Sequence, residues 1–288
     1  MKFTKAQGIG NDFVVIEAGT AKRDWSRLAV AMCDRHYGVG ADGVLLVVPS
    51  DIADCGMRVF NADGSEAEAC GNGLRCIVKY VVDNGLVKPK ADEISVATLG
   101  GLRKAKVFRS GGKVTRVRVG MGKPGFKPEE IPVTILPGEG SVVDIKSMTN
   151  YTLTAGGEKL VLNLVSMGNP HAVCFLQKPV SDFPLLQIGP KVECHRVFPK
   201  RTNFEVVQVL DRGHIEARVW ERGAEETLAC GSGACAIAVA AQLHGYAGSK
   251  VGVKLPGGEL EIEWDGKGEV FLSGPAEIVF TGEWPDDK

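Results

Sequence analysis

The sequence contains no long apolar run, no long basic run and no secretion signal. Its longest helical apolar segment, residues 234–243, is too short to cross a bilayer. The residues after Met1 lead into an expected strand rather than into the apolar core of a signal peptide. With 34 basic and 35 acidic residues the net charge is −1, which argues against nucleic acid or an anionic membrane as a partner. We therefore expect a cytoplasmic protein that binds neither.

The sequence also lacks the features of a disulfide-rich or metal-binding protein. Its eight cysteines are spread over a long chain and lie within apolar patterns, so we expect reduced, mostly buried thiols. Zinc is the competing interpretation, but the pairs Cys70–Cys76 and Cys230–Cys235 would point to different faces of a helix. A structural role is the simpler interpretation for Cys33, Cys55, Cys76, Cys174, Cys194 and Cys235. No metal is expected.

Short β-type runs separated by glycine-rich turns make up most of the 288 residues, which suffice for two domains. Several runs alternate apolar and polar residues, as half-buried antiparallel strands do. We expect strands over 13–17, 44–48, 57–60, 114–119, 205–210, 259–264 and 270–272. Helices are few, and the spacing of apolar residues predicts them over 24–34, 74–82 and 234–243.

The tripeptide Ala-Cys-Gly occurs twice, around Cys70 and around Cys230. Each copy continues as Cys-Gly-X-Gly into an expected buried helix, and each follows a β-type run that ends in an aromatic residue, Phe60 or Trp220. If two similar halves faced each other across a cleft, one thiol would lie on each side of a bound substrate. That arrangement suits moving a proton from one face of a carbon atom to the other.

The repeat extends beyond the cysteines, because residues 8–13 resemble residues 166–171 and the two expected buried helices correspond. Each half contains a strand, a Gly-Asn loop, further strands and then the start of a central helix. The prediction is an α+β fold of two similar domains, each a curled, mostly antiparallel sheet around a central helix, with the active site in the cleft between them.

The expected domains are residues 1–126 plus 276–288, which contain Cys70, and residues 127–275, which contain Cys230. Residues 121–128, rich in glycine and proline, are the expected connector. The last segment, 273–284, is expected to return and pair with the first domain.

A cysteine directly before a helix is well suited to acid and base chemistry. Unsatisfied N–H groups and the positive end of the helix dipole favour the thiolate and lower the pKa of the thiol. The glycines after Cys70 and Cys230 allow close backbone approach and expose N–H donors to a carboxylate. One cysteine would supply a thiolate and the other a thiol, while the helix N-termini stabilise the charge left when the α-proton departs. No pyridoxal-binding lysine motif is present, so no cofactor is expected.

Several candidate polar residues also have a simpler structural interpretation. An asparagine in a glycine-rich loop is typical of a turn, and this applies to Asn11, Asn169 and Asn203. His171 lies between Pro170 and apolar residues, where a buried, hydrogen-bonded histidine is common. Glu221 and Arg222 could form a solvated surface pair.

Five motifs together resemble the diaminopimelate epimerase family over essentially the whole chain. They are Gly8-Ile-Gly-Asn-Asp-Phe, Gly38-Val-Gly-Ala-Asp-Gly, Gly168-Asn-Pro-His, and the two cysteine motifs that begin at Asn61 and at Glu221. That family interconverts LL- and meso-2,6-diaminopimelate without a cofactor, on the route to lysine and peptidoglycan.

The resemblance implies that Cys70 and Cys230 are the acid and base, that His171 and Glu221 lie beside the reacting centre, and that the protein is a homodimer. It further implies substrate contacts from Asn11, Asn61, Gly71, Asn72, Asn169, Asn203, Glu221, Arg222, Gly231 and Ser232. Chemistry agrees with this set, because a substrate with two zwitterionic ends needs both donors and acceptors. Glu221 can receive an ammonium group, and Arg222 can hold the distal carboxylate bidentately.

Two positions depart from the family pattern. The family often has glycine where this chain has Glu225, which predicts an extra charge or a different turn before Cys230. Some members have glutamine in contact with substrate at the position of Gly43, so here that contact would be absent or made by the backbone.

Two other functions remain open from the sequence. A proline or hydroxyproline racemase-type enzyme uses the same two-cysteine scheme, but its cyclic substrates with one carboxylate would give Glu221 and Arg222 little purpose. A non-catalytic two-lobed amino-acid-binding protein would have structural cysteines and would exchange no deuterium at the ligand α-carbon. Because the halves look alike, the sequence does not assign either cysteine to a stereoisomer.

Overall fold

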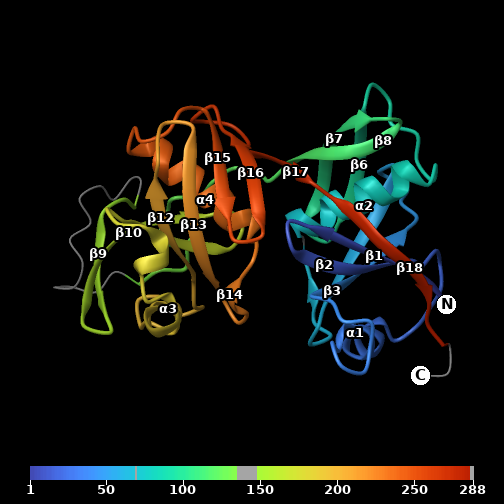
Figure 1. Cartoon of the computed structure of the whole chain (residues 1–288), viewed down its shortest axis with the longest axis horizontal. Coiled ribbons are helices and arrows are strands. Elements are labelled where there is room, and N and C mark those ends of the chain that lie inside the picture. The colour runs from blue at the N-terminus through green and yellow to red at the C-terminus, as the bar shows by residue number, and fades with distance from the viewer. Residues whose placement is uncertain (69, 135–147, 286–288) are drawn as a thin grey trace. The chain divides into compact units, whose positions relative to one another are not determined.

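A computed structural model describes residues 1–68, 70–134 and 148–285 (Figure 1). The chain divides into two compact units: unit 1 is Met1–Gly120 with Ser273–Lys288, and unit 2 is Met121–Leu272. Ala69 of the first cysteine motif, residues 135–147 of the expected second domain and residues 286–288 of the expected first domain lie outside the described residues.

Unit 1 is a curled, mostly antiparallel sheet in which the strands lie in the order β18, β1, β2, β3, β4, β6, β7 and β8. The pairs β2–β3 and β4–β6 are parallel, and the short β5 pairs with β4. The strands are β1 (Lys2–Gly8), β2 (Asn11–Glu17), β3 (Gly43–Val48), β4 (Cys55–Asn61), β5 (Glu66–Ala67), β6 (Glu93–Thr98), β7 (Gly101–Ser110), β8 (Lys113–Gly120) and β18 (Glu277–Glu283).

The last strand, β18, runs antiparallel to the first strand of the chain, with Glu283 opposite Lys2 and Glu277 opposite Gln7 (Figure 1). The main-chain N–H of Trp284 also donates to the carbonyl of Met1 at 2.7 Å. These contacts confirm the prediction that the final segment returns to pair with the N-terminal part of the chain.

Unit 2 repeats the first seven positions of this order, from β18 to β7, as β9, β10, β11, β12, β13, β15 and β16. Here β11–β12 and β13–β15 are the parallel pairs, and the short β14 pairs with β13. The strands are β9 (Tyr151–Ala155), β10 (Glu158–Ser166), β11 (Pro170–Phe175), β12 (Asn203–Val209), β13 (His214–Glu221), β14 (Glu225–Thr227), β15 (Lys250–Leu255) and β16 (Gly258–Glu263). The strand β17 (Phe271–Pro275) begins at the end of unit 2 and continues into unit 1. The predicted connector is bonded into this unit, since Met121 N donates to Val270 O and Gly125 pairs with Ser166.

One central helix packs against several strands of each sheet, which explains why the sheets curl. In unit 1, α2 (Gly71–Asp83) contacts strands that include β1, β2, β3 and β8. In unit 2, α4 (Gly231–Leu243) contacts β10, β11, β12, β15 and β16. Nearly all of α4 is buried, and its many alanines let it approach the strands closely. The α+β architecture of two similar units, each a curled sheet around a central helix, is therefore present.

A second helix covers the other face of the sheet in each unit. In unit 1 this is α1 (Trp25–Cys33), whose Trp25, Leu28 and Met32 pack with Val14 and Phe60. Asp24 caps α1 by accepting a hydrogen bond from Arg27 N at 3.0 Å. In unit 2 it is α3 (Leu185–Glu193), which packs in the core around Tyr151, Phe204 and Trp220.

The sequence analysis missed α3, and the prediction of only three clear helices is therefore wrong. Pro190 lies inside α3, and a proline there removes one backbone hydrogen bond, which weakens the sequence signal for a helix. The repeat itself contained the missing information. We call the difference in residue number between Cys70 and Cys230 the repeat offset. Adding it to the bounds of α1 gives the bounds of α3.

The repeat offset also relates the registers of the sheets. Val44 pairs with Phe60 in unit 1, and Phe204 pairs with Trp220 in unit 2. The following hairpins also correspond, since Phe60 is opposite Glu66 and Trp220 is opposite Glu226. The two units are thus equivalent residue by residue around their cysteines. No helix within the described ranges is long and apolar enough to span a bilayer.

Candidate active site

Cys70 and Cys230 occupy the same structural position, the N-cap of the central helix in each unit. Their backbones are extended, with φ/ψ of −141°/115° at Cys70 and −117°/108° at Cys230. The Sγ of Cys70 accepts the N–H of Gly73 at 3.4 Å, and the Sγ of Cys230 accepts the N–H of Gly233 at 3.3 Å. Each sulfur thus lies against the N–H groups at the positive end of a helix dipole.

This capping explains why both helices begin earlier than predicted, at Gly71 and Gly231 rather than at Leu74 and Ala234. Extended residues with a side-chain acceptor are favoured at the N-cap, so the cysteine starts the helix and the glycines form its first turn. At Gly233 a Cβ atom would lie 3.2 Å from the Sγ of Cys230 and 3.0 Å from Oε1 of Glu205. Glycine there therefore leaves room for the sulfur.

In unit 1, two amide side chains lie beside Cys70. Oδ1 of Asn11 accepts a hydrogen bond from Nδ2 of Asn72 at 3.1 Å and lies 4.0 Å from the Sγ of Cys70. Nδ2 of Asn11 donates to Asp42 at 2.7 Å, and Oδ1 of Asn72 accepts from the buried Arg75 at 2.9 Å. Asp42 accepts and Arg75 donates, so these two charged groups fix the orientation of both amides.

In unit 2, a longer chain of polar groups leads to Cys230. Nδ1 of the fully buried His171 lies 2.6 Å from Oε1 of Glu205, and its Nε2 lies 3.0 Å from Oδ1 of Asn169. Nδ2 of Asn169 donates to Oγ of Ser232 at 3.3 Å, and this hydroxyl lies 3.6 Å from the Sγ of Cys230. Asn169 and Ser232 occupy the positions of Asn11 and Asn72 in the repeat, so the structure brings equivalent predicted residues together in both units.

Glu221 also lies near Cys230, and its carboxylate accepts a hydrogen bond from the hydroxyl of Thr227. Burial raises the pKa of the Glu221 carboxyl above its ordinary value. Burial, followed by the carboxylates of Glu221 and Glu205, raises the pKa of the Cys230 thiol well above its ordinary range. The expectation that the helix N-terminus lowers this pKa is wrong for Cys230, because the contribution of Gly233 N–H is outweighed.

Two further predicted residues meet at the turn that follows β13. Oδ1 of the buried Asn203 accepts the main-chain N–H of Arg222 at 2.9 Å, while its Nδ2 donates to Pro170 O at 2.8 Å. The Arg222 side chain is exposed, and its Nη1 donates to the carbonyl of Lys200 at 3.3 Å. Asn203 is therefore more than a turn residue, since it joins the Arg222 turn to the strand that carries His171.

The equivalent turn in unit 1 begins at Asn61. Its Nδ2 donates to Oγ of Ser65 at 2.9 Å, and its main-chain N–H donates to Ser65 O at 2.9 Å. Asn61 corresponds to Glu221 by the repeat offset, so the structure places it on the hairpin that leads to Cys70.

An ion pair that the sequence analysis did not identify braces this hairpin in both units. Arg58 forms two hydrogen bonds with Glu66 at 2.6 and 3.0 Å, and Arg218 forms two with Glu226 at 2.7 and 2.9 Å. Such bidentate pairs fix geometry as well as charge. The signal that could have found them is again the repeat, because both the arginine and the glutamate recur at the repeat offset.

Both departures from the family pattern have a structural explanation. Glu225 adopts a φ of +62°, in the left-handed region that favours glycine, so the backbone retains a conformation for which glycine is best suited. Gly43 pairs with Phe13 just as Asn203 pairs with His171, so Gly43 occupies in unit 1 the position that Asn203 occupies in unit 2. Because Gly43 has no side chain, unit 1 has no amide group equivalent to that of Asn203.

The other cysteines differ from this pair in their surroundings. Cys76 and Cys235 are completely buried in the interiors of α2 and α4, and burial raises the pKa of Cys76 to about 12. Cys33, Cys55 and Cys174 are also buried, in line with the expectation of mostly buried thiols, whereas Cys194 is exposed at the end of α3.

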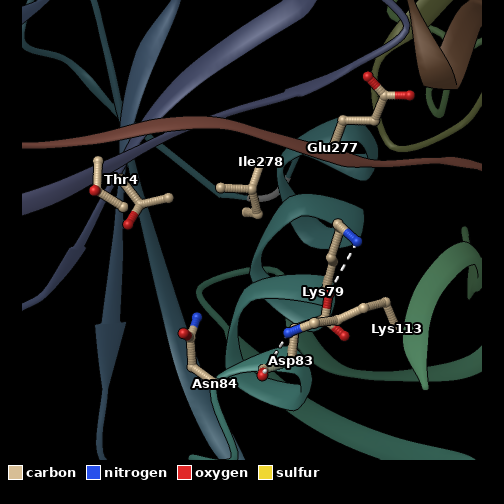
Figure 2. A pocket seen from close by; sticks show the side chains of 8 residues that line it. Thr4, Lys79, Asp83, Asn84, Lys113, Glu277 and Ile278 are labelled. Atoms are coloured by element: carbon tan, nitrogen blue, oxygen red, sulfur yellow. Dashed lines mark hydrogen bonds and ion pairs between the residues drawn. The ribbon is translucent and has the colours of Figure 1, made fainter. Parts of the chain in front are cut away.

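A hollow of unit 1 lies away from Cys70, beside the C-terminal end of α2. Figure 2 shows Thr4, Lys79, Asp83 and Lys113 among its lining residues. Lys79 pairs with Asp83 at 2.9 Å and also donates to the carbonyl of Val114, so these contacts join α2 to β8. The charges of this hollow thus stabilise the packing of the helix.

Solved structures with this fold place the chain in a structural class. A PhzF-family phenazine biosynthesis protein from Bacillus anthracis matches with a TM-score of 0.70 and 16% identity, covering 99% of both chains. A probable proline racemase from Agrobacterium radiobacter matches with a TM-score of 0.68 and 16% identity, covering 99% of this chain and 93% of the other. At these identities the likeness shows the fold alone, which this chain shares with the PhzF-family and proline racemase structures.

The sequence comparisons then identify the family. The family model described as diaminopimelate epimerase matches residues 3–127 and 163–279. Diaminopimelate epimerase from Pelotomaculum thermopropionicum is 49% identical, over 99% of each chain. The protein of the same name from Moorella thermoacetica is 47% identical over the full length of both chains. This chain belongs to the diaminopimelate epimerase family.

Proposed function

We propose that this protein is an isomerase that interconverts LL- and meso-2,6-diaminopimelate without pyridoxal phosphate or another cofactor, by proton transfer at the α-carbon. The observation that carries the proposal is the repeated N-cap: Cys70 and Cys230 occupy equivalent positions and bond to equivalent N–H groups, of Gly73 and Gly233. A thiolate on one face of the carbon removes the proton, and the thiol on the other face delivers one.

The electrostatic surroundings support different starting roles for the two cysteines. Burial and the carboxylates of Glu221 and Glu205 favour the protonated thiol at Cys230. Cys70 lies instead beside the neutral amides of Asn11 and Asn72, with Arg75 behind Asn72. We therefore assign the initial, protonated thiol to Cys230.

The backbone at the two helix N-termini supports binding of the substrate carboxylate. N–H groups near Gly71, Asn72, Gly231 and Ser232 lie in the first turn of α2 or α4, where orphan donors and the helix dipole favour an anion. The same donors stabilise the negative charge that spreads onto the carboxylate when the proton leaves. Charge stabilisation of this kind serves the role that an electron-sink cofactor has in other enzymes.

The second zwitterionic end of the substrate accounts for the remaining polar residues. Asn11, Asn61 and Asn169 offer amides that can donate and accept, Arg222 offers a guanidinium for a carboxylate, and Asn203 holds the Arg222 turn. Glu221 lies near Cys230, while His171 orients Asn169. These two residues adjust the protonation and position of the catalytic groups of unit 2.

The wider setting follows from the same proposal. The protein acts in the cytoplasm as a homodimer, on a small-molecule substrate, and supplies precursors of lysine and peptidoglycan. The proposed catalytic domains are residues 1–126 with 276–288, around Cys70, and residues 127–275, around Cys230. Their boundaries differ from those of units 1 and 2, which change at Gly120 and at Ser273. The match of the family model to segments in both parts of the chain supports this two-domain assignment.

The decisive experiment is incubation with meso-diaminopimelate in D2O, following stereochemistry and label together. We expect LL-product to carry deuterium at the inverted centre before recovered substrate carries any, because the incoming proton derives from the opposite thiol. Exchange without inversion would contradict the two-base mechanism. Binding without exchange would favour a non-catalytic amino-acid-binding protein.

Proline racemase activity is the second candidate, favoured by the shared fold. The Arg222 turn argues against it, because proline has no distal carboxylate or ammonium group for Arg222 and Glu221 to bind. Turnover of proline at a rate equal to that of diaminopimelate would reject our assignment.

A further inference from the structure

We propose that Glu193 is a positioning residue that fixes the turn carrying Glu221 and Arg222, and through this turn governs recognition of the distal end of the substrate. This inference rests on the proposed function. Glu193 was not among the residues expected at the site, and it lies at the C-terminal end of α3, outside both cysteine motifs.

The carboxylate of Glu193 is buried and accepts hydrogen bonds from both ends of the sequence Trp220-Glu221-Arg222-Gly223. Its Oε2 accepts the indole N–H of Trp220 at 2.7 Å, and its Oε1 accepts the main-chain N–H of Gly223 at 3.0 Å. Glu221 and Arg222 lie between these two anchors. One side chain thus holds the residues immediately before and after the proposed substrate-binding pair, and we call this arrangement the Glu193 clamp.

The remaining main-chain donors of the turn are also engaged. The N–H of Arg222 donates to Oδ1 of Asn203 at 2.9 Å, and the N–H of Ala224 donates to Glu221 O at 3.1 Å. The carbonyl of Glu193 accepts the N–H of Thr202 at 3.3 Å, next to Asn203. Glu193 therefore supports the turn directly through Gly223 and indirectly through the segment that carries Asn203.

Comparison with unit 1 shows that the clamp belongs to unit 2. By the repeat offset, Glu193 corresponds to Cys33, Trp220 to Phe60 and Asn203 to Gly43. These equivalents cannot form the same hydrogen bonds: Cys33 has no carboxylate, Phe60 has no indole N–H and Gly43 has no amide side chain. Glu193, Trp220 and Asn203 thus occur together in the unit that carries Glu221 and Arg222, whereas unit 1 adopts the same fold without these three side chains.

A carboxylate is required at this position because every partner is a donor. The third partner is Arg201, whose exposed side chain donates to Oε1 at 3.4 Å. Glutamine has nearly the same shape, but its NH2 group would face either the buried indole N–H or the N–H of Gly223, and neither can accept. Glu193→Gln therefore breaks one anchor while leaving the volume of the core unchanged.

The kinetic consequence follows from which group is displaced. Arg222 binds the distal carboxylate equally in the ground state and in the transition state, so its displacement weakens uniform binding and raises KM more than it lowers kcat. A merely structural defect that reduced the fraction of folded enzyme would lower kcat and leave KM unchanged. The split between KM and kcat thus separates positioning from stability.

The test compares Glu193→Gln with Arg201→Gln in the full-length protein. Arg201→Gln removes the exposed ion pair to Glu193 but leaves both buried anchors, so it is the matched control. For Glu193→Gln we expect KM for diaminopimelate to rise about tenfold with kcat reduced less than about threefold. Amide hydrogen exchange of the 221–224 turn, measured without substrate, should accelerate in Glu193→Gln and not in Arg201→Gln.

A double variant tests whether the donor introduced by Glu193→Gln is the cause of the defect. In Glu193→Gln with Trp220→Phe the indole N–H is gone, so the glutamine NH2 no longer opposes a donor and its oxygen can accept from Gly223. We expect this double variant to have slower turn exchange and lower KM than Glu193→Gln alone.

The outcomes test two claims separately: that Glu193 holds the turn, and that the held turn governs substrate recognition. Wild-type KM together with accelerated turn exchange in Glu193→Gln would overturn the role in substrate recognition, and unchanged exchange would overturn the clamp itself. An equal rise of KM in Arg201→Gln would assign the effect to the surface ion pair and also overturn it. Failure of the wild-type protein to turn over diaminopimelate would reject the proposed function, while the exchange measurement still tests the clamp.

Discussion

The carboxylate of Glu205 lies 2.6 Å from Nδ1 of His171, and neither side chain is exposed to solvent. Glu205 lies on β12, next to the first turn of α4, where its Oε1 is 3.0 Å from the position of a Cβ atom on Gly233. Its charge is one cause of the raised pKa of Cys230. In unit 1 the residue equivalent to Glu205 is Leu45, so the two cysteines share a backbone geometry but have different electrostatic surroundings.

The first prediction concerns the paired thiols. Cys70→Ala and Cys230→Ala should each reduce epimerisation in both directions by about 10³-fold or more, because loss of one proton-transfer group disables both directions. Initial rates from LL- and from meso-diaminopimelate measure the effect. A serine at either position should also be poorly active, because its hydroxyl seldom ionises near neutral pH.

The matched controls are Cys76→Ala and Cys235→Ala, one in each central helix. Both side chains are completely buried behind the N-caps, so these variants should lose some stability but keep most of their activity. Near-normal turnover by either N-cap alanine variant would show that the paired-thiol mechanism is wrong.

The second prediction concerns the pH dependence of Cys230. Its pKa lies well above the ordinary thiol value, so at neutral pH the sulfur is protonated, and alkylation by iodoacetamide should keep accelerating as the pH rises beyond 9. Glu221→Gln removes the second-largest cause of the shift, so the pKa falls and alkylation at pH 8 becomes faster. Peptide mapping of Cys230 in a Cys70→Ala background measures the rate.

Glu259→Gln is the control for this measurement, because Glu259 is an exposed carboxylate on β16. It should leave the alkylation profile of Cys230 unchanged. The raised pKa of Cys230 also makes the stability of the protein depend on pH. The stabilising contribution of a thiol whose pKa is raised by folding is fully present below its pKa in the unfolded chain, and it is lost as the pH rises through its pKa in the folded chain. A slower reaction in Glu221→Gln would contradict the role of the Glu221 charge.

The third prediction concerns Arg222. A charge-assisted hydrogen bond contributes about 1.5–3 kcal/mol, so Arg222→Ala should raise KM for diaminopimelate about 10- to 100-fold. Arg212→Ala is the control, because Arg212 is also exposed and also donates to a backbone carbonyl, that of Gly245, at 3.0 Å. Steady-state kinetics of both variants decide the point, and equal KM values would remove Arg222 from the substrate site.

The fourth prediction concerns the turn before Cys230. Glu225 has a φ of +62°, which costs a non-glycine residue about 1–2 kcal/mol. Part of the gain on replacing it is lost to the greater freedom of glycine in the unfolded chain, so Glu225→Gly should stabilise the protein by about 0.5–1 kcal/mol. Urea denaturation measures the change. Glu225→Ala retains the strained backbone and should give no such gain, so equal stabilisation by both variants would argue against backbone strain as the cause.

Local sequence determined much of the fold and of the site. The spacing of apolar residues predicted α1 and the interiors of α2 and α4, because these helices bury a face or their whole surface. The repeated Cys-Gly-X-Gly motif predicted that two equivalent helices follow the cysteines, although both begin three residues earlier than expected because each cysteine caps its helix. The motifs were also sufficient to indicate the diaminopimelate epimerase family, which the sequence comparisons confirm.

The tertiary structure decided what depends on residues distant in sequence. α3 forms around Pro190 because its Gly189 packs directly against the ring of Trp220 on the later strand β13, and this packing offsets the lost backbone hydrogen bond. The protonation of Cys230 likewise depends on Glu205 and Glu221, which the strands β12 and β13 bring to the thiol. A pKa is set by burial and by nearby charges in space. The sequence therefore located both cysteines, and only the folded chain made their surroundings different.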